Sequence, residues 1–176
     1  KYCGVTHEHV STPSNNKNIN LGKQTLFIND VGDGGSKKNK FERDIDLLQK
    51  GIQDEPNNVR YHFYLANSYK DIGKLDEAIE YYKKRIRMGD WDQEIWYSYY
   101  SIANIYESRN DIGNAVLYWL KAYNLNPNRL ENIYKIVQHY RLTGECQIAK
   151  LFYDIAITTL NKNINRDDFL FLANDV

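Results

Sequence analysis

Residues 60–93 read RYHFYLANSYKDIGKLDEAIEYYKKRIRMGDWDQ, and this stretch decides the fold. It divides into two amphipathic segments joined by a short Asp-Ile-Gly-Lys turn at residues 71–74. Each segment carries a small residue, Ala66 or Ala78, among larger apolar and aromatic ones. Two antiparallel helices approach closely only where one presents a small side chain opposite a bulky one of the other. The stretch therefore predicts a helical hairpin.

The same pattern recurs twice further along the chain. Ala78, Ala115 and Ala149 hold the same place in successive copies, 37 and 34 residues apart, and the three extra residues fall in the connection 88–91. A period of about 34 residues resembles the tetratricopeptide repeat. The resemblance implies an all-α superhelix of about three helical hairpins, and the strand-like sequence before it is expected to be a short strand-and-loop remnant of an α/β domain. The matching positions are Leu65, Ala66, Tyr69, Gly73, Ala78 and Tyr82; Ile102, Ala103, Tyr106, Ala115, Trp119, Ala122 and Pro127; and Ile136, Val137, Tyr140, Gly144, Ala149, Tyr153 and Ala156.

The pattern also predicts how the chain is divided. A helix that caps the first hairpin is expected before Pro56, because Phe41, Ile45 and Leu48 share one face and a terminal repeat needs a cover. Since the chain begins at Lys1 in strand-like sequence, we expect it to be a piece of a longer protein. The expected parts are a remnant of a preceding domain at 1–38, a repeat domain at 39–160 (capping helix 40–54, repeats about 58–88, 93–125 and 129–160), and a linker with the start of a further element at 161–176.

Charge and cysteine content limit the classes of function. The chain has 23 basic and 23 acidic residues, so its net charge of zero gives no electrostatic case for binding nucleic acid or an anionic membrane. No apolar run approaches the ~20 residues of a membrane span. Cys3 and Cys146 lie far apart and are expected to be free thiols, which favours a reducing, cytoplasmic location.

Two stretches near the start could carry chemistry. On a strand, His7 and His9 would point the same way and could share a divalent cation, with Glu8 between them. A solvated strand end is the alternative, because zinc-type sites need three or four ligands. The turn Asp33-Gly34-Gly35-Ser36-Lys37 offers free amides and a cation for a phosphate, but it lacks P-loop spacing, and a plain turn is favoured.

The repeats themselves offer a groove along their first helices. Asn67 and Asn104 hold equivalent positions, and a carboxamide can both donate to and accept from the backbone of an extended peptide. The pattern thus predicts a peptide or protein partner, with ordinary solvated side chains as the alternative. The candidate groove residues are Arg60, Phe63, Asn67 and Lys70; Tyr97, Tyr100, Asn104 and Glu107; and Glu131, Tyr134, Gln138 and Arg141.

Three motifs follow one another before the repeats: Gly4-Val5-Thr6-His7-Glu8, then Asp33-Gly34-Gly35-Ser36-Lys37, then Lys40, Arg43, Asp44, Ile45, Leu47 and Leu48. Their order resembles the end of the catalytic domain and the adjoining repeats of family-2-like (GT-A) glycosyltransferases. The resemblance implies a parent enzyme that transfers a sugar from a nucleotide-sugar donor to a glycan or protein acceptor with Mn²⁺ or Mg²⁺. His7 would handle the metal with Glu8 beside it, and residues 33–37 would lie near the donor or acceptor.

The catalytic part of such an enzyme is not in this sequence. Asp44 and Asp46 form an Asp-x-Asp string, but it falls on a predicted helix and is rejected as the metal motif. We therefore expect no catalysis and no cofactor from this chain alone, with the repeats binding the acceptor or a partner, or mediating oligomerisation. The alternative is a non-catalytic tetratricopeptide scaffold for protein–protein interaction.

Overall fold

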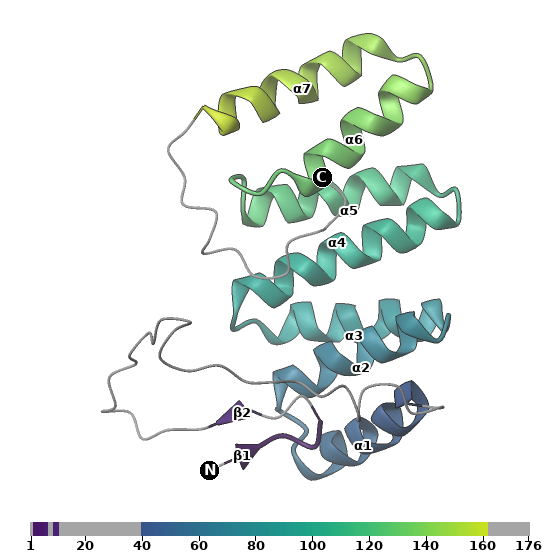
Figure 1. The fold of residues 1–176 in the computed structure, drawn as a ribbon, viewed down its shortest axis with the longest axis vertical. Helices are drawn as coiled ribbons and strands as arrows, with labels where there is room; N and C mark the ends of the chain where they lie inside the picture. Colours follow the sequence, from purple (N-terminus) through teal and green to yellow (C-terminus); the bar gives the residue numbers. More distant parts are fainter. Residues whose placement is uncertain (1, 7–8, 11–39, 162–176) are drawn as a thin grey trace, which may run out of the picture.

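The computed structural model describes residues 2–6, 9–10 and 40–161. Within these residues, seven helices follow one another in chain order along a single stack, each packed against the next (Figure 1). The expected all-α fold of three tetratricopeptide-type hairpins is confirmed: α2–α3, α4–α5 and α6–α7, with α1 packed on α2. The bounds are α1 Lys40–Asp54, α2 Val59–Asp71, α3 Leu75–Met88, α4 Asp92–Ser108, α5 Ile112–Leu125, α6 Glu131–Leu142 and α7 Cys146–Leu160. Before them, β1 (Tyr2–Cys3) pairs antiparallel with β2 (His9–Val10).

The three hairpin turns share one backbone geometry. Gly73, Asn110 and Gly144 hold the same place and have φ values of 78°, 59° and 83°. Glycine adopts this left-handed region without strain, and asparagine tolerates it better than most residues. In each turn the next amide donates to the carbonyl five residues earlier: Lys74 to Tyr69, Asp111 to Tyr106 and Glu145 to Tyr140, each 2.9 Å. These bonds satisfy carbonyls that the helix end leaves open.

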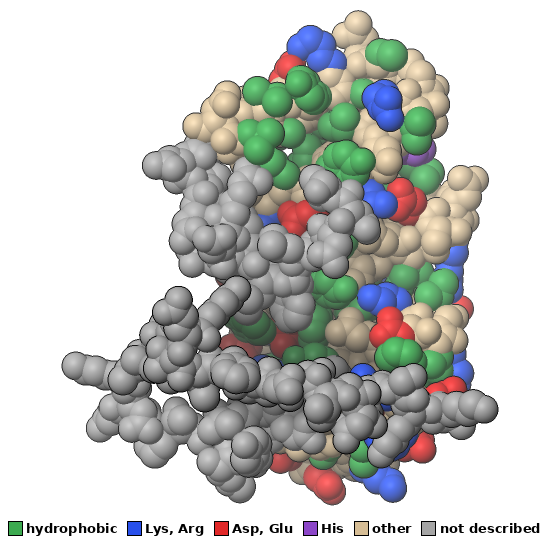
Figure 2. All heavy atoms as spheres, viewed as in Figure 1, with side chains coloured by type: hydrophobic (Ala, Val, Ile, Leu, Met, Phe, Trp, Pro, Cys, Tyr) green, Lys and Arg blue, Asp and Glu red, His purple; other side chains and the backbone are tan. Residues whose placement is uncertain are grey.

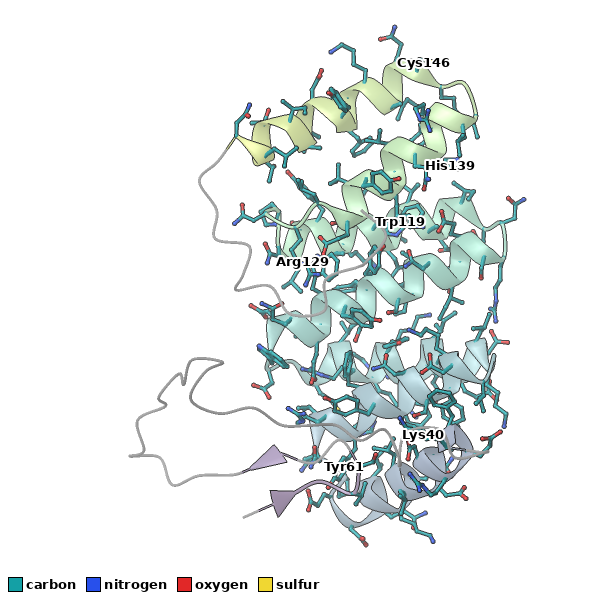
Figure 3. All side chains as sticks on the ribbon, in the orientation of Figure 1. Lys40, Tyr61, Trp119, Arg129, His139 and Cys146 are labelled. Atoms are coloured by element: carbon teal, nitrogen blue, oxygen red, sulfur yellow. The ribbon has the colours of Figure 1, made fainter. Side chains whose placement is uncertain are left out.

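The core is continuous because α4 contributes side chains to both of its hydrophobic clusters. Ile102 and Ile105 of α4 pack into one cluster with side chains of α1, α2 and α3. Trp96 and Tyr100 of the same helix pack into a second cluster with α5 and α6, around the buried indole of Trp119 (Figure 3). Burial of apolar area of this kind is the main stabilising term, at about 25 cal/mol per Å².

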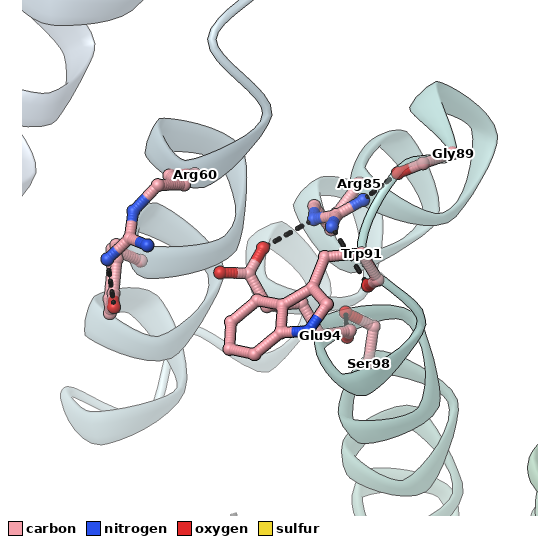
Figure 4. Close-up of polar contacts among 7 residues, drawn as sticks. Arg60, Arg85, Gly89, Trp91, Glu94 and Ser98 are labelled. Atoms are coloured by element: carbon pink, nitrogen blue, oxygen red, sulfur yellow. Dashed lines mark hydrogen bonds and ion pairs between the residues drawn. The ribbon is translucent and has the colours of Figure 1, made fainter. Parts of the chain in front are cut away.

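A buried ion pair fixes the longer connection between α3 and α4. The Arg85 side chain is 0% exposed, and its Nε donates to Oε2 of Glu94 at 2.8 Å. The same guanidinium donates to the carbonyls of Gly89 and Trp91 (Figure 4). Arg85 therefore holds the three extra residues of this connection against the start of α4.

The next junction uses a second buried arginine. Arg129, in the connection from α5 to α6, donates to Glu131 and, at 3.4 Å, to Gln93. Its guanidinium carbon lies 3.5 Å from the ring centroid of Trp96, a cation–π contact. Glu131 is buried in this pair, so its predicted place in an accessible groove is wrong.

Candidate functional site: the face of the first helices

Two cavities lie side by side between the first helices of successive repeats. One has a volume of about 320 Å³ and is bounded by α1, α2 and α4. The other has a volume of about 250 Å³ and is bounded by α2, the start of α3 and α4. Lys70 and Tyr97 line both cavities. The two cavities thus form one groove along this face.

The contact between Lys70 and Tyr97 forms the wall that the two cavities share. The Lys70 Nζ lies 3.5 Å from the Tyr97 hydroxyl and 5.5 Å from the ring centroid. Both side chains are partly exposed, so both remain reachable from the groove. A cation held over an aromatic face offers both a charge and a flat apolar surface to a ligand.

The cavity beside α1 carries charges of both signs. Lys40, Asp44, Lys70 and Asp71 all line it. Asp44 is 2% exposed, and among the described residues its Oδ1 pairs with Arg43 at 3.4 Å. A buried carboxylate with so long an ion pair favours a further cation or hydrogen-bond donor in the cavity.

Tyr64 lines the same cavity and keeps its proton at neutral pH. Burial raises the pKa of the Tyr64 hydroxyl, and the Arg60 guanidinium opposes this rise. Arg60 Nη2 donates to the Tyr64 hydroxyl at 3.0 Å, and its Cζ lies 5.4 Å from the ring centroid. The predicted groove residue Arg60 therefore lies on this face, engaged with Tyr64.

The two asparagines have an internal role that sequence reasoning did not find. Asn67 Oδ1 accepts from the Tyr82 hydroxyl at 2.5 Å, and Asn104 Oδ1 accepts from Nε1 of Trp119 at 3.0 Å. In each case the donor lies 15 residues later, on the second helix of the same hairpin. Each carbonyl oxygen thus already accepts one bond within its hairpin, and the amide Nδ2 groups can donate to a peptide as predicted. Both residues still line the cavities.

Besides Glu131, the structure corrects a second groove residue, Phe63, and the predicted residues of the third repeat lie apart from the two cavities. Phe63 is 0% exposed and packs edge-to-face on Tyr64, Tyr82 and Tyr97, so its predicted accessibility is wrong. Tyr100 is 5% exposed, stacks on Trp96 and is among the residues that line a cavity. On α6, Tyr134 and Arg141 are exposed and Gln138 is half-buried, and none of them lines these two cavities. Glu107 reaches across to Lys135 at 3.3 Å.

Asp44, Asp71 and Lys40 are site residues that the repeat template missed. The signal for Asp44 was a charged residue among Phe41, Ile45 and Leu48 on the inward face of α1. It lies on that helix, so its rejection as part of a loop-borne metal motif agrees with the structure.

The remaining predicted sites fall outside the described residues. His7, Glu8 and the turn at residues 33–37 are not described, and His9 is described only through the pairing of its backbone with Cys3. Among the described residues, no group of three His, Cys, Asp or Glu side chains could hold a metal. The metal and donor-loop roles thus stay predictions.

Three further features of the described part bear on partners. Basic and acidic side chains are interspersed on the face that Figure 2 shows, without a large area of one sign. No described helix combines the length and the apolarity that a bilayer crossing requires. Cys146 is an exposed free thiol at the start of α7 (Figure 3).

Comparisons with known proteins agree with this architecture. Family models described as tetratricopeptide repeat match residues 47–80 and 97–129. A crystal structure of the MamA protein superposes with a TM-score of 0.56 at 27% identity, over 68% of this chain and 64% of that one. Structures of MamA AMB-1 and MamA MSR-1 give TM-scores of 0.55 and 0.55 at 19% and 18% identity, over 72% and 70% of this chain and 67% and 70% of theirs.

No curated protein sequence matches the chain. The comparisons named above support the repeat resemblance and give no support to the resemblance to a glycosyltransferase. The chain therefore contains two tetratricopeptide repeats, within a helical stack that has the fold of MamA.

Proposed function

We propose that the chain is a protein-interaction scaffold that holds an extended peptide segment of a partner along the first-helix face. The observation that carries the proposal is the pair of adjoining cavities with Lys70 and Tyr97 as their shared wall. An extended peptide places alternate side chains on one side, so neighbouring pockets suit its successive anchors. The tetratricopeptide matches and the likeness to MamA support a scaffold rather than an enzyme.

The side chains that line the groove indicate which side chains such a peptide would carry. The cavity beside α1 offers the Asp44 carboxylate and the rings of Tyr64 and Tyr97 to a basic or polar side chain. The next cavity adds the apolar Leu75 and Ile105 beside Asn104, whose amide can donate to a peptide carbonyl. We therefore expect a mixed motif, with a basic anchor followed by an apolar one.

Selection of linear peptides on phage against the full chain tests this proposal. Asp71→Lys should weaken the binding of the selected peptides tenfold or more, because it places a positive charge in the cavity that would hold the basic anchor, and Asp71 is exposed, so the fold tolerates the change. Asp154→Lys is the matched control: Asp154 is an exposed acidic residue on α7, away from the groove, and its replacement should leave affinity unchanged. Selected peptides that bind both variants equally well, or no enrichment at all, would contradict the groove as the binding site.

Sugar transfer by a longer parent protein rests on the sequence resemblance alone. Its key residues, His7, Glu8 and residues 33–37, lie outside the described part of the chain. No described contact favours it, and it stays a prediction, as do a divalent metal, a nucleotide-sugar partner and the cytoplasmic location.

A further inference from the structure

The second helix of the last hairpin presents an uncovered apolar face. Tyr153, Ile157 and Leu160 are 53%, 36% and 50% exposed. Their spacing places them on one side of α7. Figure 2 shows hydrophobic side chains gathered at this end of the stack. We call these three residues the α7 face.

The earlier hairpins show what normally covers this position. Tyr82 and Trp119 hold the place of Tyr153 and are both 0% exposed. Tyr82 shares a cluster with Ile102 of α4, and Trp119 shares one with Ile133 and Ile136 of α6. In each hairpin, therefore, the first helix of the next repeat packs over the second helix of the one before.

The third hairpin also lacks the internal bond of the other two. Gln138 precedes Tyr153 by 15 residues, as Asn67 precedes Tyr82, yet no bond joins Gln138 to Tyr153 in the described part of the chain. Tyr153 is thus 53% exposed and has no such bond among the described residues, although it stands in the register of two fully buried side chains. The α7 face has the position of an interface between repeats.

The sequence beyond α7 repeats the motif of a first helix. Residues 170–176 read LFLANDV, beside FYLANSY at 63–69 and YSIANIY at 100–106. The Leu-Ala-Asn group at 172–174 follows its counterpart at 136–138 by 36 residues, between the earlier spacings of 37 and 34. Residues 161–176 contain no proline or glycine to break a helix, and Asp167 and Asp168 suit its first turn.

The register also identifies the side chains that would face α7. With the spacing of 36 residues, Phe169 corresponds to Ile133 and Leu172 to Ile136. Ile133 and Ile136 are both 0% exposed and pack on α5. A large apolar residue thus stands at both places where α6 covers the hairpin before it.

We propose that residues 167–176, which lie outside the described part of the chain, form the first helix of a further repeat and pack on the α7 face through Phe169 and Leu172. The repeat stack of this protein then extends past its third hairpin. The α7 face is an internal joint of the stack and not a docking surface for another protein.

Hydrogen exchange on the full 176-residue chain tests this assignment from both sides. Leu172→Asp should speed amide exchange in the second half of α7 tenfold or more, and Ile157→Asp should do the same for residues 167–176. Leu151→Asp is the matched control, because Leu151 is 60% exposed on another side of α7 and its replacement should change neither segment. Amide exchange in α1–α6 of the Leu172→Asp chain checks that these helices stay folded.

Three results would overturn the proposal. The first is amide exchange of residues 167–176 in the unsubstituted chain as fast as in an unstructured peptide. The second is unchanged exchange of α7 in the Leu172→Asp variant. The third is a dimer in sedimentation that Ile157→Asp dissociates and Leu172→Asp does not, which would assign the α7 face to a second copy of the chain.

Discussion

Replacing Arg85 by methionine should destabilise the chain more than any surface substitution of similar size. Arg85 and Glu94 are 0% and 1% exposed in their side chains and lie 2.8 Å apart. Methionine fills much of the volume but leaves the Glu94 carboxylate buried without its cation. The other oxygen of Glu94, Oε1, already has no partner among the described residues. The carboxylate would then lose its main compensating interaction.

The expected cost follows from this burial. Breaking a buried ion pair by removing one partner costs about 3–5 kcal/mol, because an uncompensated charge remains inside. For a chain of this size that loss lowers Tm by about 6–20 °C. Arg109→Met is the matched control: Arg109 pairs with Asp76 at 2.7 Å, but the two side chains are 36% and 84% exposed. Its loss should cost about 1 kcal/mol or less.

Urea unfolding followed by tryptophan fluorescence and by circular dichroism measures both variants. Trp96 and Trp119 are buried reporters in the second and third hairpins' shared core. Coincidence of the two probes checks that the stack unfolds as one unit, which repeat proteins do not always do. The double variant Arg85→Met/Glu94→Leu should recover most of the lost stability. A cost for Arg85→Met no larger than that for Arg109→Met would refute the reasoning.

Three further predictions test the hairpins. Asn104→Ala should lower the free energy of unfolding by about 1–3 kcal/mol, because it leaves the buried indole N–H on α5 without an acceptor. Gln138→Ala, at the same place in the third hairpin, should cost much less. Denaturant titration compares the two, and equal costs would count against the internal bond. Gly73→Ala should destabilise the chain by about 1–2 kcal/mol, because φ at Gly73 is 78°. Gly113→Ala should instead stabilise it by about 0.5–1 kcal/mol, because Gly113 lies inside α5 with open space where a Cβ would be. Tm shifts of the same sign in the two variants would contradict this prediction. Burial raises the pKa of Tyr82 in the folded chain. The stability that this group contributes is therefore complete below its pKa in the unfolded chain, about 10, and is lost as pH rises towards its pKa in the folded chain. Tyr82→Phe should flatten this alkaline fall in stability, and an unchanged fall would exclude Tyr82 as its cause.

The sequence predicted on which face of its helix each residue lies, but not how deeply its side chain is buried. Ala78 and Ala115 are fully buried, as the small-against-large rule required. Phe63 was placed in the groove because it shares a helical face with Asn67, yet it is buried among tyrosine rings. Periodicity gives the direction of a side chain within its helix, whereas neighbours on other helices decide whether solvent reaches it.

The residues that line the cavities likewise include some that the sequence predicted and some that it did not. Asn67, Asn104, Lys70 and Tyr97 were predicted from repeat register, and all four line the groove. Asp44 joined them only through the packing of α1 on α2, which places a carboxylate from another helix beside them. No spacing within one repeat predicts a residue that an adjoining helix contributes.

The sequence by itself determined the repeat: the period, the hairpin turns with glycine or asparagine at their left-handed positions, and the small residues at the helix crossings. These are local properties, since each depends on residues within about one repeat length. Only the tertiary structure decided the use of the polar groups. The Arg85–Glu94 pair, the bonds of Asn67 and Asn104 to aromatic donors, and the shared wall between two cavities form between helices. Such contacts depend on the distance and angle between packed helices, which side-chain volumes across the whole interface set together.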